Sequence, residues 1–257
     1  MLYVLVYSFT GFSIFIWLHL AALGVSLLCW KVFGLSDYSK FKQSGPFRVG
    51  VREFRTEEYS NDCTIYYPAA SDGSGKIGIP YLAYGANQIK GLRAVIECSK
   101  PDLIKLGDFL LNSFVFKPLG LVTIPAYKNA NPALNTMQPV FFSHGLTANR
   151  RHYSALCMEL ASCGYCVVAL THNDGSADYS SQCGAYDKAE MYDYWVRNFG
   201  CKVRSKELRG CVKEVTSAPF LKAFGTEWKN VKLSGEVVLM GHSFGGITAL
   251  TAAQDCP

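Results

Sequence analysis

Short apolar runs bounded by turns are the feature that most constrains the fold of this chain. Pro139–Ser143 (PVFFS) and Cys166–Leu170 (CVVAL) flank a segment with apolar residues at helical spacing, Tyr153 to Ala161. A fully apolar run such as Cys166–Leu170 is typical of a parallel strand covered by helices on both faces. The order strand, helix, strand predicts a βαβ unit with a right-handed crossover.

The rest of the chain extends this pattern. Glu236–Met240 (EVVLM) predicts another buried strand, and Gly245–Ala253 predicts a helix of small residues after it. A long connecting segment separates this strand and helix from the βαβ unit. It contains helical, charged stretches around Tyr192–Val196 and Val203–Val215. Alternation of this kind indicates an α/β domain with a mostly parallel sheet and helices on both faces.

Two strands and a helix are expected upstream of the βαβ unit, and two residues are expected to mark the ends of its helix. Phe47–Phe54 and Cys63–Tyr67 have the alternation and β-branched content of strands. Asp102–Phe116 predicts a helix with a broad apolar face. Asn149 is a candidate N-cap for the helix of the βαβ unit, and Gly164 is expected to end that helix.

Composition excludes several classes of protein. With 257 residues and 49% hydrophobic content, the chain is long enough for one domain with a real core and is not disordered. The net charge of +5 comes from dispersed Lys and Arg residues, so we expect no nucleic-acid partner. The ten cysteines show no disulfide framework, and Cys163-x-x-Cys166 lacks the partners of a zinc site. We therefore expect no metal and no organic cofactor.

The N-terminal segment is strongly apolar. Leu2–Trp30 contains no Asp, Glu, Lys or Arg, and as a helix it would be about 43 Å long, more than the ~30 Å of a bilayer core. Lys31, Lys40 and Lys42 follow it and favour a cytoplasmic body. We expect residues 1–34 to be a membrane anchor and residues 45–257 to be an incomplete domain of this α/β class. A cleaved signal peptide, which would make the protein secreted, and a mispredicted start are the alternatives.

The chemical motif follows the strand Glu236–Met240. Gly241, Ser243 and Gly245 form G-x-S-x-G between that strand and the helix that begins at Gly245. This context is that of a nucleophile elbow, a strained turn that exposes a serine at the top of a sheet. Glycines two residues to either side avoid clashes in so tight a turn. The sequence therefore predicts Ser243 as the nucleophile of an ester hydrolase.

The negative charge that develops on an ester oxygen during attack needs two backbone donors. The N–H of Phe244 is one candidate, because it follows the serine at the start of a helix. The loop after Pro139–Ser143 is expected to provide the other, the N–H of Leu146, with Gly145 allowing close approach. We interpret His144 as a structural residue of that loop.

Several blocks together resemble the platelet-activating-factor acetylhydrolases of the plasma and intracellular type II groups. The resemblance runs from about Gly45 to the end of the chain. It rests on TIYYP at 64–68, FSHGL at 142–146, YSALCMELAS at 153–162, HNDGSA at 172–177, VRN at 196–198 and GHSFGG at 241–246.

The resemblance implies an α/β-hydrolase fold and a calcium-independent phospholipase A2 activity. Such an enzyme removes short or oxidised acyl groups from the sn-2 position of phospholipids. By position, Ser243 would be the nucleophile, and Leu146 and Phe244 the backbone oxyanion donors. The helix Asp102–Phe116 would correspond to the interfacial helix that contacts the membrane.

The base and its orienting carboxylate are not found after Ser243, where this fold places them. All histidines precede it, at positions 19, 144, 152, 172 and 242. We therefore interpret the sequence as a hydrolase fold truncated after the elbow, and expect the 257-residue chain alone to show no enzymatic esterase rate. A general carboxylesterase or polyester-type hydrolase, and a non-catalytic pseudo-hydrolase, remain as alternatives.

Overall fold

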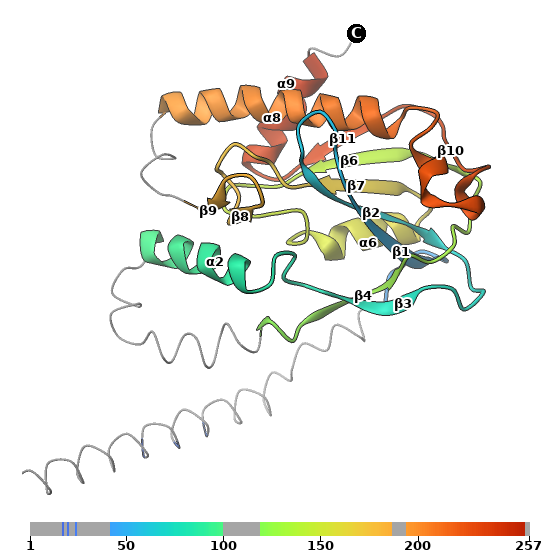
Figure 1. The fold of residues 1–257 in the computed structure, drawn as a ribbon, viewed down its shortest axis with the longest axis horizontal. Coiled ribbons are helices and arrows are strands. Elements are labelled where there is room, and N and C mark those ends of the chain that lie inside the picture. Colours follow the sequence, from blue (N-terminus) through green and yellow to red (C-terminus); the bar gives the residue numbers. More distant parts are fainter. Residues whose placement is uncertain are drawn as a thin grey trace, which may run out of the picture. The chain divides into compact units, whose positions relative to one another are not determined.

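The computed structural model describes residues 42–99, 119–186 and 194–254, together with Trp17, Leu20 and Gly24. The chain divides into two compact units, Met1–Lys42 and Gln43–Pro257. Within the second unit, a seven-stranded sheet has the order β11-β6-β7-β2-β1-β4-β3 (Figure 1). Its strands are β1 (Arg48–Arg55), β2 (Asp62–Ala69), β3 (Lys76–Pro80), β4 (Thr123–Lys128), β6 (Pro139–Ser143), β7 (Cys166–Leu170) and β11 (Val238–Gly241).

The α/β fold class is confirmed, and the parallel part of the sheet is the part that carries the motif. Strands β11, β6 and β7 are parallel, with Gly241, Ser143 and Leu170 in register at their carboxyl ends. The other half is mixed, because β2 runs antiparallel to both β7 and β1. Loops that leave parallel strands at their carboxyl ends meet at one edge of the sheet, which is where open α/β sheets bind ligands.

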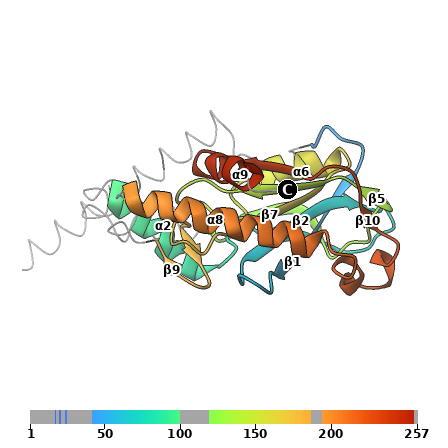
Figure 2. The same cartoon turned by 90° about the horizontal axis from the view of Figure 1, so that it is seen from above.

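Helices cover both faces of the sheet. The helix α6 (Ser154–Ser162) connects β6 to β7, so the predicted βαβ unit is present. Two further helices, α8 (Tyr194–Val215) and α9 (Phe244–Gln254), pack against each other. Seen from above, α8 extends along the sheet (Figure 2). The remaining helical elements are α2 (Ala86–Ser99) and the 3₁₀ turns η3 (Leu221–Phe224) and η4 (Thr226–Trp228). Two small two-stranded sheets complete the described part. In one, β5 (Thr136–Met137) pairs with β10 (Lys232–Leu233), and in the other, β8 (Tyr179–Ser180) pairs with β9 (Gly184–Ala185).

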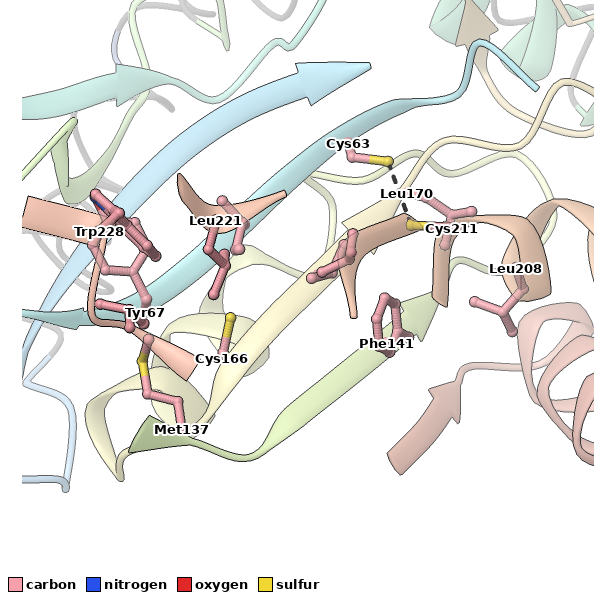
Figure 3. Packing of buried hydrophobic residues seen from close by; sticks show 14 of the residues in the cluster. Cys63, Tyr67, Met137, Phe141, Cys166, Leu170, Leu208, Cys211, Leu221 and Trp228 are labelled. Carbon is pink, nitrogen blue, oxygen red and sulfur yellow. Dashed lines mark hydrogen bonds between the residues drawn. The ribbon is translucent and has the colours of Figure 1, made fainter. Parts of the chain in front are cut away.

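Alternation along the apolar strands divides the core between the two faces. Val167 and Ala169 of β7 pack in the cluster that contains α6, whereas Val168 and Leu170 pack in the cluster that contains α8 and α9. Figure 3 shows the second cluster, in which Leu170 lies near Cys211 of α8. Each strand residue is therefore buried, on one face or the other, which explains why β7 has no polar position.

Some expectations differ from the structure. The two charged stretches predicted near 192–196 and 203–215 belong, in the described part, to one continuous helix, α8. Asn149 does not cap α6, whose N-cap residue is Tyr153. Instead, Asn149 Oδ1 accepts the Arg151 N–H at 2.9 Å and closes the turn before the helix. Gly164 does follow the end of α6, with φ +108°.

Two predicted segments lie wholly or largely outside the described residues. The helix expected at Asp102–Phe116 is entirely outside them, and Leu2–Trp30 is represented only by Trp17, Leu20 and Gly24. Within the described ranges, no helix combines the length and the apolar character needed to cross a membrane.

Candidate active site

The turn between β11 and α9 has the geometry of a nucleophile elbow. Ser243 has φ +53°, a left-handed conformation that is unfavourable for a residue with a side chain. A Cβ on Gly241 would lie 2.1 Å from the Gly245 carbonyl oxygen, and one on Gly245 would lie 2.1 Å from the Ser143 carbonyl oxygen. Both glycines are therefore required by close backbone contacts.

Three residues singled out from the sequence come together around one pocket. Leu146, Ser243 and Phe244 line a hollow of about 810 Å³ at the carboxyl edge of the parallel strands. The remaining lining residues come from α8 and α9: Asn198, Cys201, Lys202, Ile247 and Thr251. The hollow thus combines apolar surface with a single cationic side chain, that of Lys202, among the described lining residues.

The loop that carries Leu146 is held by the elbow itself. The His242 N–H donates to the Ser143 carbonyl oxygen at 3.2 Å, so the elbow is tied to the end of β6. A Cβ on Gly145 would lie 2.9 Å from the Tyr153 hydroxyl and 3.0 Å from His242 Nδ1. Gly145 therefore permits the loop to pass close to the elbow, which places the Leu146 backbone beside the turn that contains Ser243.

Each of the four described histidines is engaged by neighbours other than Ser243. His172 is fully buried, with Nε2 at 2.8 Å from Ser143 Oγ and Nδ1 at 2.6 Å from Glu207 Oε2. His152 Nδ1 accepts the Asn149 N–H at 3.0 Å. Over the described ranges, no hydrogen bond joins the Ser243 side chain to a histidine or a carboxylate, so the proton acceptor that such a serine needs is not among these contacts.

A buried polar network beneath the site was not anticipated from the sequence. The Arg204 guanidinium of α8 is fully buried and pairs with Asp174 at 2.9 Å. It donates to the His144 carbonyl oxygen at 2.7 Å and lies over the Phe244 ring, 4.3 Å from the ring centroid. One cation thus touches both loops that border the pocket.

Hydrogen bonding in this network assigns the form of His144. Its Nε2 accepts the His172 N–H at 3.1 Å, and its Nδ1 lies 2.7 Å from the Gly145 carbonyl oxygen, so Nδ1 carries the proton. Burial and the nearby Arg204 lower the pKa of His144 well below its usual value. The ring is therefore neutral and structural, in agreement with the sequence interpretation.

The same buried network also includes His172 and Glu207, which link α8 to the ends of the strands. Burial lowers the pKa of His172 well below its usual value and raises the pKa of Glu207 to about 7. Glu207 Oε1 also accepts the Asn173 N–H at 3.1 Å. The hydrogen-bonded series Ser143–His172–Glu207 has the connectivity of a catalytic triad. All three side chains are buried, so a substrate cannot reach them. The series therefore connects α8 to the ends of β6 and β7.

Comparison with known proteins decides the family. Residues 34–256 match the family described as platelet-activating factor acetylhydrolase, isoform II. The chain belongs to this family. Platelet-activating factor acetylhydrolase of Canis lupus familiaris is 30% identical over 83% of this chain and 52% of its own, and that of Cavia porcellus is 31% identical over the same shares. This chain of the acetylhydrolase family therefore spans about half the length of these curated relatives.

Two further matches cover smaller shares of the other proteins or are less similar in sequence. A putative phospholipase A2 of Schizosaccharomyces pombe is 28% identical over 54% of this chain and 40% of its own. The solved structure of a ferulic acid esterase from Streptomyces cinnamoneus aligns with a TM-score of 0.53 and 21% identity, over 83% of this chain and 56% of the other. At that identity the likeness supports the fold alone.

Proposed function

We propose that this chain carries the nucleophile and the oxyanion donors of a serine esterase that removes short or oxidised sn-2 acyl groups from phospholipids. The observation that carries the proposal is the left-handed Ser243, which stands in a tight turn and lines a pocket together with Leu146 and Phe244. Family membership supports the ester-hydrolase chemistry.

In the proposed reaction, Ser243 Oγ adds to the sn-2 carbonyl carbon and its proton passes to a base. The backbone N–H groups of Leu146 and Phe244 stabilise the oxyanion that forms. The intermediate then collapses: the sn-2 C–O bond breaks, the lysophospholipid oxygen takes the proton from the base, and the acyl group remains on Ser243. Water hydrolyses this acyl-enzyme and restores the serine.

The pocket is consistent with a phospholipid substrate. Its volume of about 810 Å³ falls within the range of small-molecule sites. Leu146 and Ile247 offer apolar contact for an acyl chain, whereas the Lys202 ammonium is complementary to a phosphate group. A neutral ester would make no use of that cation.

Acetate release from a short-chain phospholipid tests this function. The proposed preference for short acyl groups predicts that the native, full-length protein hydrolyses 1-alkyl-2-acetyl-phosphocholine with a kcat/KM at least about tenfold above that for the corresponding long-chain 2-acyl lipid. Acetate and free fatty acid would be measured by chromatography. Turnover of p-nitrophenyl acetate without turnover of either lipid would favour a general carboxylesterase, and no turnover of any ester would favour a non-catalytic module.

We also propose that the protein associates with membranes through residues 1–34 and the segment Asp102–Phe116. The apolar, uncharged run Leu2–Trp30 supports the first contact, and the broad apolar pattern of the second segment supports the other. A catalytic body on the cytoplasmic side follows from the lysines after the run, unless the run is cleaved and the protein is secreted.

A fractionation experiment separates these possibilities. The native protein should remain in the membrane pellet after alkaline carbonate extraction, and deletion of residues 1–34 should release it. The deleted form should still bind phospholipid vesicles weakly, and Leu106→Asp should weaken that binding further because it places a charge on the apolar face. Recovery of the native protein in the medium, with a shortened N-terminus, would contradict the anchor.

A further inference from the structure

The Tyr153 hydroxyl joins the two loops that border the nucleophile pocket. It accepts the Gly145 N–H at 3.2 Å and lies 2.9 Å from His242 Nδ1. The hydroxyl therefore hydrogen-bonds to both loops at once, as acceptor from Gly145 and as partner of the His242 imidazole.

Both partners of this hydroxyl are close in sequence to the proposed oxyanion donors. Gly145 immediately precedes Leu146, and His242 lies two residues before Phe244. The two loops come from different strands, β6 and β11, and Tyr153 itself lies 89 residues before His242. One oxygen atom thus joins segments that each provide one proposed donor, in addition to the backbone bond from His242 N–H to the Ser143 carbonyl oxygen.

The position of the Tyr153 ring is fixed by packing. Its centroid lies 4.8 Å from that of Phe142 and 5.5 Å from that of His242, in tilted arrangements. A methyl group on Gly145 would contact both the hydroxyl and the imidazole at 3.0 Å or less. The ring therefore holds its hydroxyl in one place, and removal of the hydroxyl alone leaves the ring packing intact.

We propose that Tyr153 is a positioning residue of the oxyanion hole, which sets the distance between the Leu146 and Phe244 amides. The proposal rests on the proposed esterase function. An oxyanion hole is effective only when both donors lie at hydrogen-bond distance from the same developing charge. Loss of the hydroxyl removes one of the contacts that the two loops share, so the donors separate slightly and stabilise the transition state less.

Tyr153→Phe in the native protein is the direct test. With p-nitrophenyl acetate, we expect kcat to fall about tenfold while KM changes less than twofold, because an interaction made in the transition state is weakened. The preference for this ester over its thiono analogue should also fall, since sulfur accepts hydrogen bonds poorly and depends less on the hole. A merely structural role would not change that preference.

Tyr67→Phe provides the matched control. The Tyr67 hydroxyl is buried and donates to the Ala130 carbonyl oxygen at 2.7 Å, on a strand end opposite the nucleophile edge. Deleting it removes one hydroxyl hydrogen bond of the same kind, so thermal stability should fall slightly while kcat and the oxygen preference stay unchanged.

A second variant guards against a folding defect in the first. His242→Leu removes the hydrogen-bond partner of the Tyr153 hydroxyl on the elbow and should lower kcat in the same way. The double variant Tyr153→Phe with His242→Leu should have a kcat no lower than that of the less active single variant. Wild-type kcat and oxygen preference in Tyr153→Phe, or an equal loss in Tyr67→Phe, would overturn the positioning role. A native protein that hydrolyses neither ester would overturn the proposed function itself, and this role with it.

Discussion

Replacement of Ser243 by alanine is expected to lower kcat/KM for a 2-acetyl phospholipid by about 10⁴-fold or more in the native protein. The alanine lacks the oxygen that would form the acyl-enzyme, so only stabilisation by the oxyanion donors and binding would remain. Labelling by a fluorophosphonate, which attaches covalently to an activated serine, should disappear in the same variant. The decrease in rate and the loss of label would be measured on the same preparation.

Ser234→Ala is the matched control for this prediction. Ser234 is exposed and lies before β11, at the end of the strand away from the elbow. Its replacement removes the same atom and should change neither labelling nor turnover. If label persisted on Ser243→Ala, or if the rate fell less than tenfold, another residue would be the nucleophile and the elbow assignment would be wrong.

Replacement of Arg204 by leucine should destabilise the fold by about 3–5 kcal/mol, because it leaves the carboxylate of Asp174 buried without its cation. For a domain of this size, that free energy corresponds to a decrease in Tm of roughly 6–20 °C. Esterase activity should fall as well, since Arg204 contacts His144 and the Phe244 ring. Thermal unfolding followed by circular dichroism would measure the first effect.

Two comparisons isolate the buried pair. Lys206→Leu removes the same charge from an exposed position on α8. It should change the free energy of unfolding by about 0.5 kcal/mol or less, and Tm by correspondingly little. The double variant Arg204→Leu with Asp174→Asn should recover part of the lost stability, because the unpaired charge is removed too. Equal Tm values for Arg204→Leu and Lys206→Leu would show that the network does not support the fold.

The strands and the turn that carry the candidate site could be predicted from the sequence, because each is specified by residues within a short stretch of chain. The bounds of β6 and β7 match the predicted runs because burial on both faces excludes charged side chains and leaves apolar residues along each strand. Ser143, the polar residue that ends β6, is buried but hydrogen-bonded to His172. The elbow could be predicted for a related reason. Its glycines at 241 and 245 are required by contacts with backbone atoms, and the strand before it and the helix after it are visible in the sequence.

The buried network carried a weaker sequence signal. Arg204 shares a helical face with Leu208, Cys211 and Val215, which are all buried. Helical periodicity alone would have placed this arginine toward the core, but a charged helix is more often an exposed one. The decisive fact is the presence of Asp174 on a loop 30 residues earlier, and only the fold brings the two together.

The sequence by itself therefore determined the α/β class, the βαβ unit, the turn at Ser243 and the loop that carries Leu146. These depend on periodicity and on steric limits within a few residues of chain. The tertiary structure alone decided that β2 is antiparallel to its neighbours, that Arg204 and Glu207 are buried, and that Tyr153 bridges Gly145 and His242. Such contacts join residues far apart in sequence, and their free energy depends on packing and desolvation, which no local pattern encodes.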